Sequence, residues 1–341
     1  MVPTTEGTAI VYQRTWARVL TVVAAVALAA TACSSSDTGG GGGGADRPVG
    51  RLRILVGTAP GGGFDLTART AAKAMEEAKL ARNVEVQNLP GAGGTVALQR
   101  LVNEKGNGEL IQQMGLGVVG SVHTNKSKAT LADTTPLARL TQEPEIVVVG
   151  KDSRYKTLDQ LVQAWKADPG KVSVGGGSSP GGPDHLAPML MAQAVGIEPK
   201  KVTYVPFDGG GELLASVLGN KVGFGVTGVG ETVDQIESGQ VRALAVTSAE
   251  RVQGLDTPTL KESNVDLEFT NWRGWVAPPE LQGGDKEALL GLVDKLHASQ
   301  QWKDALAKNK WTDAYLAGDE FGTFVKAEDQ RVGEVLAKLG L

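Results

Sequence analysis

The stretch VGTAPGGGFDLTARTAAKAM, residues Val56–Met75, joins an apolar strand to an amphipathic helix through three consecutive glycines. Glycine loses more conformational freedom on folding than any other residue, so Gly61, Gly62 and Gly63 are unfavourable choices for a simple connection. A helix that starts directly after them presents unpaired backbone N–H groups and the positive end of its dipole. The stretch therefore predicts a strand–turn–helix unit of an α/β fold, with another group approaching its backbone.

Similar glycine-rich junctions recur along the chain. They are PGGGFD (60–65), PGAGGT (90–95), GGGSSPGGPDH (175–185) and FDGGGE (207–212). Each follows a predicted strand and precedes a predicted helix, which is the edge at which open α/β sheets bind ligands. One such junction usually only connects two elements, and an acidic residue such as Asp65 or Asp184 is usually a helix N-cap. Two junctions from each half of the chain, facing one cleft, instead predict a set of amide donors for an anion.

Short β-branched runs alternate with helical stretches from Arg51 onward, a pattern typical of parallel α/β units. The expected strands lie at 51–59, 84–87, 109–115, 172–174 and 267–281, with further strands in KVTYVPF, KVGFGV and VRALAV. The C-terminal part is expected to be helical at 286–299, 302–308 and 320–339. The extended run Arg139–Asp152 is expected to carry the chain into a second lobe. We expect the first lobe at 48–145 and 268–341, the second at 146–267, and hinges near 141–148 and between Val246 and Trp272.

The N-terminal segment has the features of a secretion signal. Arg14 and Arg18 precede an apolar run, residues 19–32, that is too short to span a bilayer comfortably. Cys33, the single cysteine, follows small residues and resembles the cysteine of a bacterial lipobox, although Ala30 stands where leucine is preferred. We expect a signal peptide at 1–32, a lipid on Cys33 and a flexible Gly/Ser tether at 33–47. The alternative is a cysteine in the leader that is never modified.

Composition excludes several classes of function. The formal net charge is −4 and there is no long basic run, so nucleic acid is not an expected partner. The glycine junctions lack the G-x-G-x-x-G and Gly-Lys-Ser/Thr patterns of nucleotide sites. His123, His185 and His297 are far apart, without the spacing of metal ligands. No G-x-S-x-G elbow is present, so we expect no cofactor, no metal and no catalytic residue.

Five motifs in succession, from about Arg51 to Leu341, carry a family resemblance. They are PGGGFD, VEVQNLPGAGGTVA, GGGSSPGGPDHLAPMLM, VTYVPFDGGGELLASVLGNKV, and the pair VRALAVTSAER and WRGWVAPPEL. The sequence resembles the tripartite tricarboxylate transporter substrate-binding (Bug-type receptor) family. The resemblance implies a type II-like periplasmic-binding-protein fold, with each lobe a mainly parallel sheet flanked by helices. It also implies an extracytoplasmic receptor that closes on a small carboxylate and presents it to a membrane permease.

The resemblance also implies which residues contact the ligand. They belong to the four junctions: Gly61, Gly62, Gly63, Phe64, Asp65, Gly91, Ala92, Gly93, Gly94, Ser178, Ser179, His185, Gly209 and Gly210. In this family one ligand carboxylate lies against the first two junctions, partly through ordered water. His185 could donate to a carboxylate, or it could only pack or cap its helix. Trp275 could wall the cleft or lie in the core, and for Trp272 we expect core or hinge packing.

One departure from the family bears on the ligand. After the strand KVGFGV many relatives carry an acidic residue that can pair with an amino group, whereas this chain has Thr227 and Gly228. We therefore expect a plain di- or tricarboxylate in place of an amino acid.

The expected mechanism is not catalytic. A ligand that binds the closed state better than the open state draws the two lobes together, and amide and hydroxyl donors suffice to hold its carboxylates. We expect a monomer. Two alternatives stay open: a sensory receptor that signals to a membrane kinase, and a lipoprotein enzyme using Asp65, Asp184 or His185 as a base.

Overall fold

A computed structural model describes residues 49–340 of the 341-residue chain. The predicted signal peptide, Cys33 and the tether lie outside the described residues, so their prediction stands as made above. Residues 49–340 fall within one compact unit. No helix in this part of the chain combines the length and apolar character needed to cross a bilayer.

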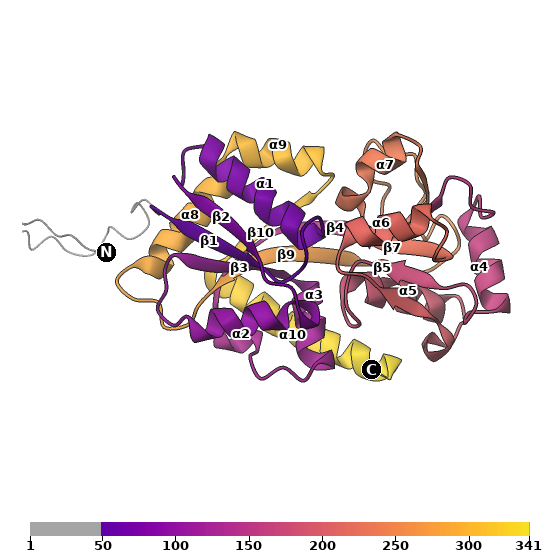
Figure 1. Ribbon diagram of the computed structural model, residues 1–341, viewed down its shortest axis with the longest axis horizontal. Helices are drawn as coiled ribbons and strands as arrows, with labels where there is room; N and C mark the ends of the chain where they lie inside the picture. Colours follow the sequence, from indigo (N-terminus) through magenta and orange to yellow (C-terminus); the bar gives the residue numbers. More distant parts are fainter. Residues whose placement is uncertain (1–48, 341) are drawn as a thin grey trace, which may run out of the picture. The chain divides into compact units, whose positions relative to one another are not determined.

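The centre of the described part is a ten-stranded sheet with the strand order β2-β1-β3-β9-β4-β7-β5-β6, in which β8 and β10 also pair with β4 (Figure 1). The strands are β1 (Leu52–Val56), β2 (Val84–Asn88), β3 (Leu110–Gly115), β4 (Thr135–Gly150), β5 (Val174–Gly176), β6 (Tyr204–Pro206), β7 (Phe224–Gly228), β8 (Val241–Val246), β9 (Thr270–Ala277) and β10 (Thr312–Ala317).

Strand β4 divides the sheet into two halves because it changes partners midway. Its first part, Thr135 to Pro144, pairs with β9 and β10, and its second part, Glu145 to Gly150, pairs with β7 and β8. We call β1, β2, β3, β9 and β10 the first half of the sheet, and β5 to β8 the second half. The extended run expected from the sequence is thus confirmed as one long strand that belongs to both halves.

The sheet is mixed. Strand β1 is parallel to β2 and β3, and β5 is parallel to β6 and β7, as the alternating pattern predicts. All pairs involving β4 or β9 are antiparallel, because the chain crosses between the halves through these strands. Each half is therefore parallel at its outer strands and antiparallel toward the middle.

Helices cover both faces of the sheet (Figure 1). Those of the first half are α1 (Gly63–Glu77), α2 (Thr95–Asn103), α3 (Leu116–Thr124), α8 (Asp285–Ala298), α9 (Gln300–Lys308) and α10 (Gly318–Leu339); those of the second half are α4 (Leu158–Ala167), α5 (Pro183–Ala194), α6 (Gly210–Leu218) and α7 (Val233–Glu237). In the first half, α1, α8 and α9 lie against one another on one face, and α3 packs with α2 and α10 on the other. In the second half, Trp165 of α4 packs edge-to-face on Phe224 of β7 at 5.1 Å.

Two elements differ from the sequence prediction. The C-terminal part is not wholly helical, because Thr312–Ala317 forms β10, antiparallel to β4. Its register shifts between Asp313 and Leu316, so the alternation that marks a strand is interrupted. Residues Leu116–Thr124 form helix α3, although their sequence LGVVGSVHT is rich in glycine and valine and lacks a helical hydrophobic pattern. Tertiary packing decides both elements.

Thr247 fastens the strands where the chain crosses between the halves. Its hydroxyl accepts from the backbone N–H of Glu145 at 2.8 Å and donates to the carbonyl of Phe269 at 2.6 Å. Its own backbone pairs with the same two residues, at 2.9 Å each. Because Thr247 is 1% exposed, water does not replace these bonds if the hydroxyl is lost.

We predict that Thr247→Val lowers the free energy of unfolding by about 1–3 kcal/mol, the typical effect of leaving buried polar groups unpaired. Urea denaturation followed by circular dichroism measures the change. Thr203→Val is the matched control, since the Thr203 hydroxyl donates to Gly170 at an exposed position, and it should change stability by less than about 0.5 kcal/mol. Equal stabilities for both variants would contradict this role of Thr247.

Candidate functional site

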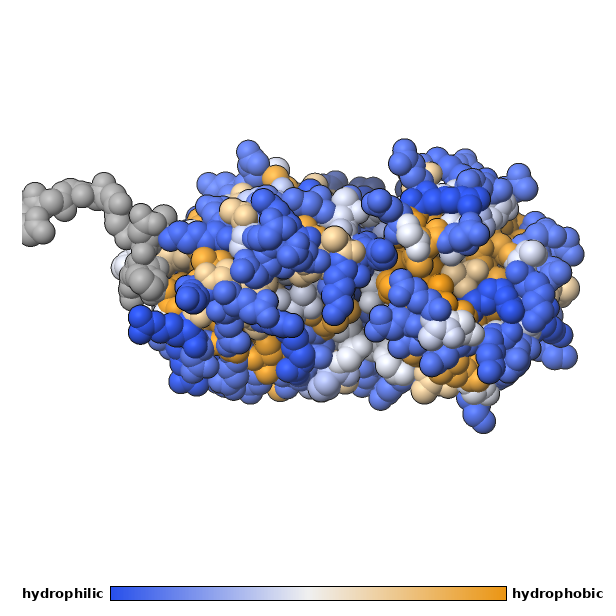
Figure 2. All heavy atoms as spheres, turned by 90° about the horizontal axis from the view of Figure 1, so that it is seen from above, coloured by the Kyte–Doolittle hydropathy of each residue, from blue (hydrophilic) through white to orange (hydrophobic). Residues whose placement is uncertain are grey.

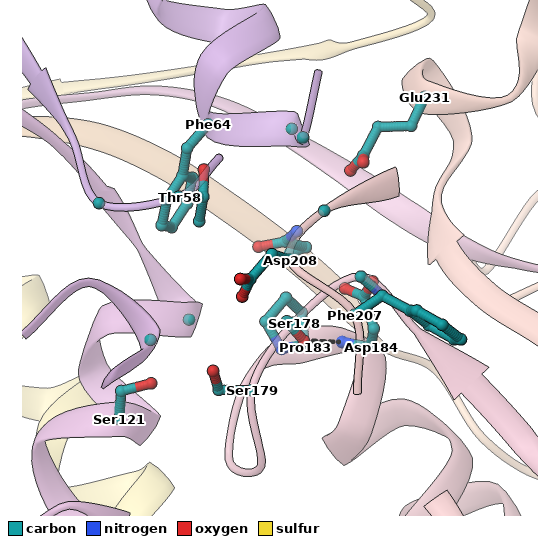
Figure 3. A pocket seen from close by; sticks show the side chains of 18 of the residues that line it. Thr58, Phe64, Ser121, Ser178, Ser179, Pro183, Asp184, Phe207, Asp208 and Glu231 are labelled. Atoms are coloured by element: carbon teal, nitrogen blue, oxygen red, sulfur yellow. Dashed lines mark hydrogen bonds between the residues drawn. The ribbon is translucent and has the colours of Figure 1, made fainter. Parts of the chain in front are cut away.

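The glycine junctions of the two halves meet around one cavity, with about 610 Å³ of empty space including the part open to solvent. From the first half it is lined by Gly57, Thr58, Gly62, Gly63, Phe64, Gly91, Gly93, Gly117, Ser121, Asn271 and Arg273, and from the second half by Gly177, Ser178, Ser179, Pro183, Asp184, Phe207, Asp208, Gly209 and Glu231 (Figure 3). Seen from above, residues of intermediate hydropathy occupy the band between the halves, within a largely hydrophilic surface (Figure 2).

The two halves touch through backbone atoms. A Cβ placed on Gly62 would lie 3.1 Å from the Cα of Gly209, and one on Gly120 would lie 1.9 Å from the carbonyl oxygen of Gly181. The hydroxyl of Thr124 also donates to the carbonyl of Pro180 at 3.1 Å, from one half to the other. A side chain at Gly120 is therefore excluded in this arrangement, and one at Gly62 would require Gly209 to shift by a few tenths of an ångström.

Three helices of the site begin without a side-chain cap. Their N-cap residues are Gly62 for α1, Gly182 for α5 and Gly209 for α6, and none of these can supply a capping oxygen. The first N–H groups of α1 are therefore available to another acceptor, whereas in α5 the N–H of Asp184 donates to Oγ of Ser178 at 3.2 Å and in α6 the N–H of Gly210 donates to Glu231. Gly62 and Gly209 themselves line the cavity, so the positive ends of α1 and α6 lie at its wall.

Side chains within the turns hold the turns themselves. In three of the four junctions, a backbone N–H at the start of the turn donates to the side chain four residues later. The pairs are Gly61 with Asp65 (2.9 Å), Gly181 with Nδ1 of His185 (3.1 Å) and Asp208 with Glu212 (3.4 Å). This shared bond fixes the start of each turn before the helix begins.

Asp65 and His185 consequently face away from the cavity. Burial alone would raise the pKa of Asp65, but hydrogen bonds from Arg69, Gly61 and Asn88 hold it below its ordinary value. Burial lowers the pKa of His185 to about 4, so the ring is neutral near pH 7, and it packs edge-to-face on Tyr204 at 4.6 Å. The structure places both residues as supports of their turns.

Unpartnered hydroxyl and amide oxygens face the cavity from the first half. The Oγ1 of Thr58, the Oγ of Ser121 and the Oδ1 of Asn271 are buried and have no hydrogen-bond partner among the described residues. Figure 3 shows the hydroxyl group of Ser121 pointing toward Ser179, which lies in the opposite half. Buried polar groups without partners are rare in native proteins, and at a cavity they indicate groups that wait for a ligand or water.

Arg273 is the cation of the cavity wall, and it is committed to ion pairs. Its Nη1 lies 2.5 Å from Oε1 of Glu143, and its Nη2 lies 3.2 Å from Oε1 of Glu231. Nη1 also donates to the hydroxyl of Thr67 in α1 at 3.3 Å. Burial alone would lower the pKa of Arg273, but the carboxylates of Glu143 and Glu231 outweigh it and hold the pKa above its ordinary value. The residue therefore links β9, β4, α1 and the segment after β7.

Three carboxyl groups also line the cavity, those of Asp184, Asp208 and Glu231. Burial raises the pKa of Asp184 to about 6 and that of Glu231 to about 8. Thr227 stands where many relatives are expected to carry an acidic residue that pairs with an amino group of the ligand. In the structure Thr227 is buried in β7 and does not line the cavity. The acidic groups of the site come from other positions.

The structure brings half of the predicted contact residues to the cavity. Those that line it are Gly62, Gly63, Phe64, Gly91, Gly93, Ser178, Ser179 and Gly209. Those that do not are Gly61, Asp65, Ala92, Gly94, His185, Gly210, Thr227 and Trp275. Trp275 is fully buried and donates to Oε1 of Gln113 at 2.8 Å, so it lies in the core and does not wall the cavity. Trp272 packs against Phe321 and Phe324, in keeping with the expected core packing.

Sequence reasoning missed several side chains of the cavity. Ser121 lies on helix α3, which the sequence pattern did not predict. Asp208 directly precedes the glycines of the junction FDGGGE and is next to the predicted contact Gly209. It could therefore have been predicted as a contact residue. Arg273 gave one signal, since a charged residue stands alone in the apolar strand NWRGWVA. Glu231 follows β7 by a few residues, and nothing in the surrounding sequence indicates that it is a site residue.

Comparisons with known proteins identify the family and the fold of this chain. Residues 67–341 match the family model described as "Tripartite tricarboxylate transporter family receptor". The protein BugT of Bordetella pertussis is 25% identical over 302 residues, covering 86% of this chain and 90% of that protein. The structure of the periplasmic binding protein BugD is similar with a TM-score of 0.78 and 24% identity, covering 86% of this chain and 99% of BugD.

MatC from Rhodopseudomonas palustris, solved with bound malate, is similar with a TM-score of 0.75 and 22% identity, covering 85% of this chain and 100% of MatC. These two structures show that the fold is that of periplasmic binding proteins. Together with the family model, they lead to one conclusion: this chain belongs to the family of tripartite tricarboxylate transporter receptors.

Proposed function

We propose that this receptor captures a small di- or tricarboxylate between the two halves of its sheet and delivers it to the membrane permease of a tripartite transporter. Membership of the family makes the chain a solute-binding receptor. The observation that carries the proposal is the convergence of uncapped helix N-termini, α1 and α6, on one cavity with unpartnered hydroxyl groups. MatC, which shares the fold, was solved with malate, a dicarboxylate.

Amide and hydroxyl donors supply the binding energy for a carboxylate in this proposal. The donors at the cavity are the first amides of α1 and the hydroxyls of Ser121, Ser178 and Ser179. Hydrogen bonds to a charged acceptor are each worth about 1.5–3 kcal/mol, so a few of them suffice without a free cation. Arg273 then acts as a structural counter-ion for Glu143 and Glu231, and does not pair with the ligand.

Closure of two lobes is the proposed mechanism. The lobes are residues 48–145 with 268–341, and residues 146–267; the hinges lie where β4 changes partners and in the segment between Val246 and Trp272. The close approach of Gly62 to Gly209 and of Gly120 to Gly181 supports an arrangement in which a ligand is enclosed. A ligand that contacts both lobes stabilises this state over the open one.

The remaining parts of the proposal concern location and chemistry. We place the receptor outside the cytoplasm, as a monomer anchored through a lipid on Cys33 after removal of residues 1–32. We assign it no catalytic activity. Of the three candidate bases, Asp65 and His185 are held by backbone N–H groups of their turns, and this commitment argues against a base at either position.

The test of the binding function is a thermal-shift screen followed by isothermal titration calorimetry with four- to six-carbon di- and tricarboxylates. At a free concentration of 100 Kd, the bound acid should stabilise the chain by about 2.7 kcal/mol. The acid should be recovered unchanged after incubation. A panel without any binder, or chemical conversion of a bound acid, would contradict the proposal.

Closure is tested with Gly120→Ala. Alanine is a better helix former than glycine inside α3, so the variant should fold at least as stably. Its Cβ would nevertheless collide with the carbonyl of Gly181 in the enclosed arrangement, so the affinity for the bound acid should fall at least tenfold. Gly170→Ala is the control, because a Cβ there meets no atom closer than 3.8 Å. Unchanged affinity in Gly120→Ala would count against closure at this contact.

Anchoring is tested with Cys33→Ser. The unaltered chain expressed in a bacterium should incorporate labelled palmitate and sediment with membranes, whereas Cys33→Ser should do neither. The leader should still be recognised in the variant, because its basic and apolar segments are intact. Palmitate incorporation that persists in Cys33→Ser would refute lipidation at this residue.

A further inference from the structure

The ionisable side chains of the cavity wall are mostly acidic. They are those of Asp184, Asp208, Glu231 and Arg273. The positive charge of Arg273 is already opposed by Glu231 and by Glu143 behind it. A plain dicarboxylate would therefore add two negative charges to a wall with no uncommitted cation among the described residues.

Asp208 is the acidic side chain of this wall that has no partner. Asp184 accepts a hydrogen bond from the backbone of Gly177 at 2.7 Å, and Glu231 pairs with Arg273 at 3.2 Å. For the carboxylate of Asp208, the described residues provide neither an ion pair nor a hydrogen-bond donor. Figure 3 shows this carboxylate pointing into the cavity from the loop before α6.

A second observation points to a ligand that brings hydrogen-bond donors. The Oδ1 of Asn271, an acceptor, lines the cavity, is buried and has no partner among residues 49–340. A protonated amine carries three donors and one positive charge. It would satisfy the carboxylate of Asp208 and acceptors such as Asn271, and it would offset the charge of an entering carboxylate.

We infer that the acid captured by this receptor carries a protonated amino group, that Asp208 binds this group, and that an amino-carboxylate is therefore preferred over the plain acid of the same skeleton. The inference rests on the proposed function, whose amide and hydroxyl donors hold the carboxylate. It reverses the expectation drawn from Thr227, because an acidic partner for an amine is supplied by the junction before α6.

Matched acids of one carbon skeleton test the inference by isothermal titration calorimetry on the purified chain. Succinate, malate and aspartate differ in carrying hydrogen, hydroxyl or ammonium at one carbon; glutarate and glutamate form a second series. In at least one series the ammonium compound should bind at least tenfold more tightly than its plain counterpart. In Asp208→Asn that advantage should fall at least tenfold, while the affinity for the plain acid should stay the same or increase.

Asp234→Asn is the matched control, since Asp234 lies exposed on α7 and does not line the cavity. It should leave all affinities unchanged, and the thermal midpoints of both variants without ligand should match that of the unaltered chain. If Asp208→Asn still prefers the amino acids as strongly as the unaltered chain does, the proposed role of Asp208 is overturned.

The outcomes separate this inference from the proposed function. Plain acids that bind as tightly as the amino acids would overturn the inference alone. If neither kind of acid binds, the proposed function fails and the inference fails with it.

Discussion

Backbone contact between the two halves of the sheet is the constraint on which the site depends. Gly62 meets Gly209 at a distance that is tight for a side chain, and Gly120 meets Gly181 at one that leaves no room for it. Because Gly62 and Gly209 are the N-cap residues of α1 and α6, their contact brings the N-termini of these two helices to one cavity. The glycines thus have two effects: they let the halves meet, and they leave amide donors uncovered for a ligand.

The side chains around this contact divide into supports and cavity-facing groups. Asp65, His185 and Glu212 each accept a backbone N–H four residues earlier, so they shape the turns without facing the cavity. Arg273 joins elements of both halves through Glu143 and Glu231, and such a buried pair contributes more to position than to net stability. The groups left for a ligand are hydroxyls, amides and Asp208, and a site of this kind selects by hydrogen-bond pattern and total charge.

The sequence predicted the architecture well because its signals are local. The glycine junctions mark the strand–helix transitions, and the long extended run Arg139–Asp152, most of which lies in β4, predicted the crossing between halves. Strand β10 and helix α3 were missed because each is decided by its neighbours: β10 by pairing with β4, and α3 by packing against α10. At the site, the turns were found from their glycines, whereas Ser121 and Arg273 depend on contacts between distant segments. The spacing of Asp65 and His185 does not show that they support their turns. The same residue types near a helix N-terminus can bind a ligand or cap the helix.

The most direct test of the central claim, that a ligand holds the two halves in contact, is a distance between them in solution. Cys33 is the only cysteine of the chain, so a Cys33→Ser background accepts one spin label on each half, at the exposed positions Gln99 of α2 and Lys166 of α4. Double electron–electron resonance then compares the labelled chain with and without a saturating acid. We expect a broad distribution that includes longer distances without ligand and a single short distance with it. The same distribution in both samples would contradict the account.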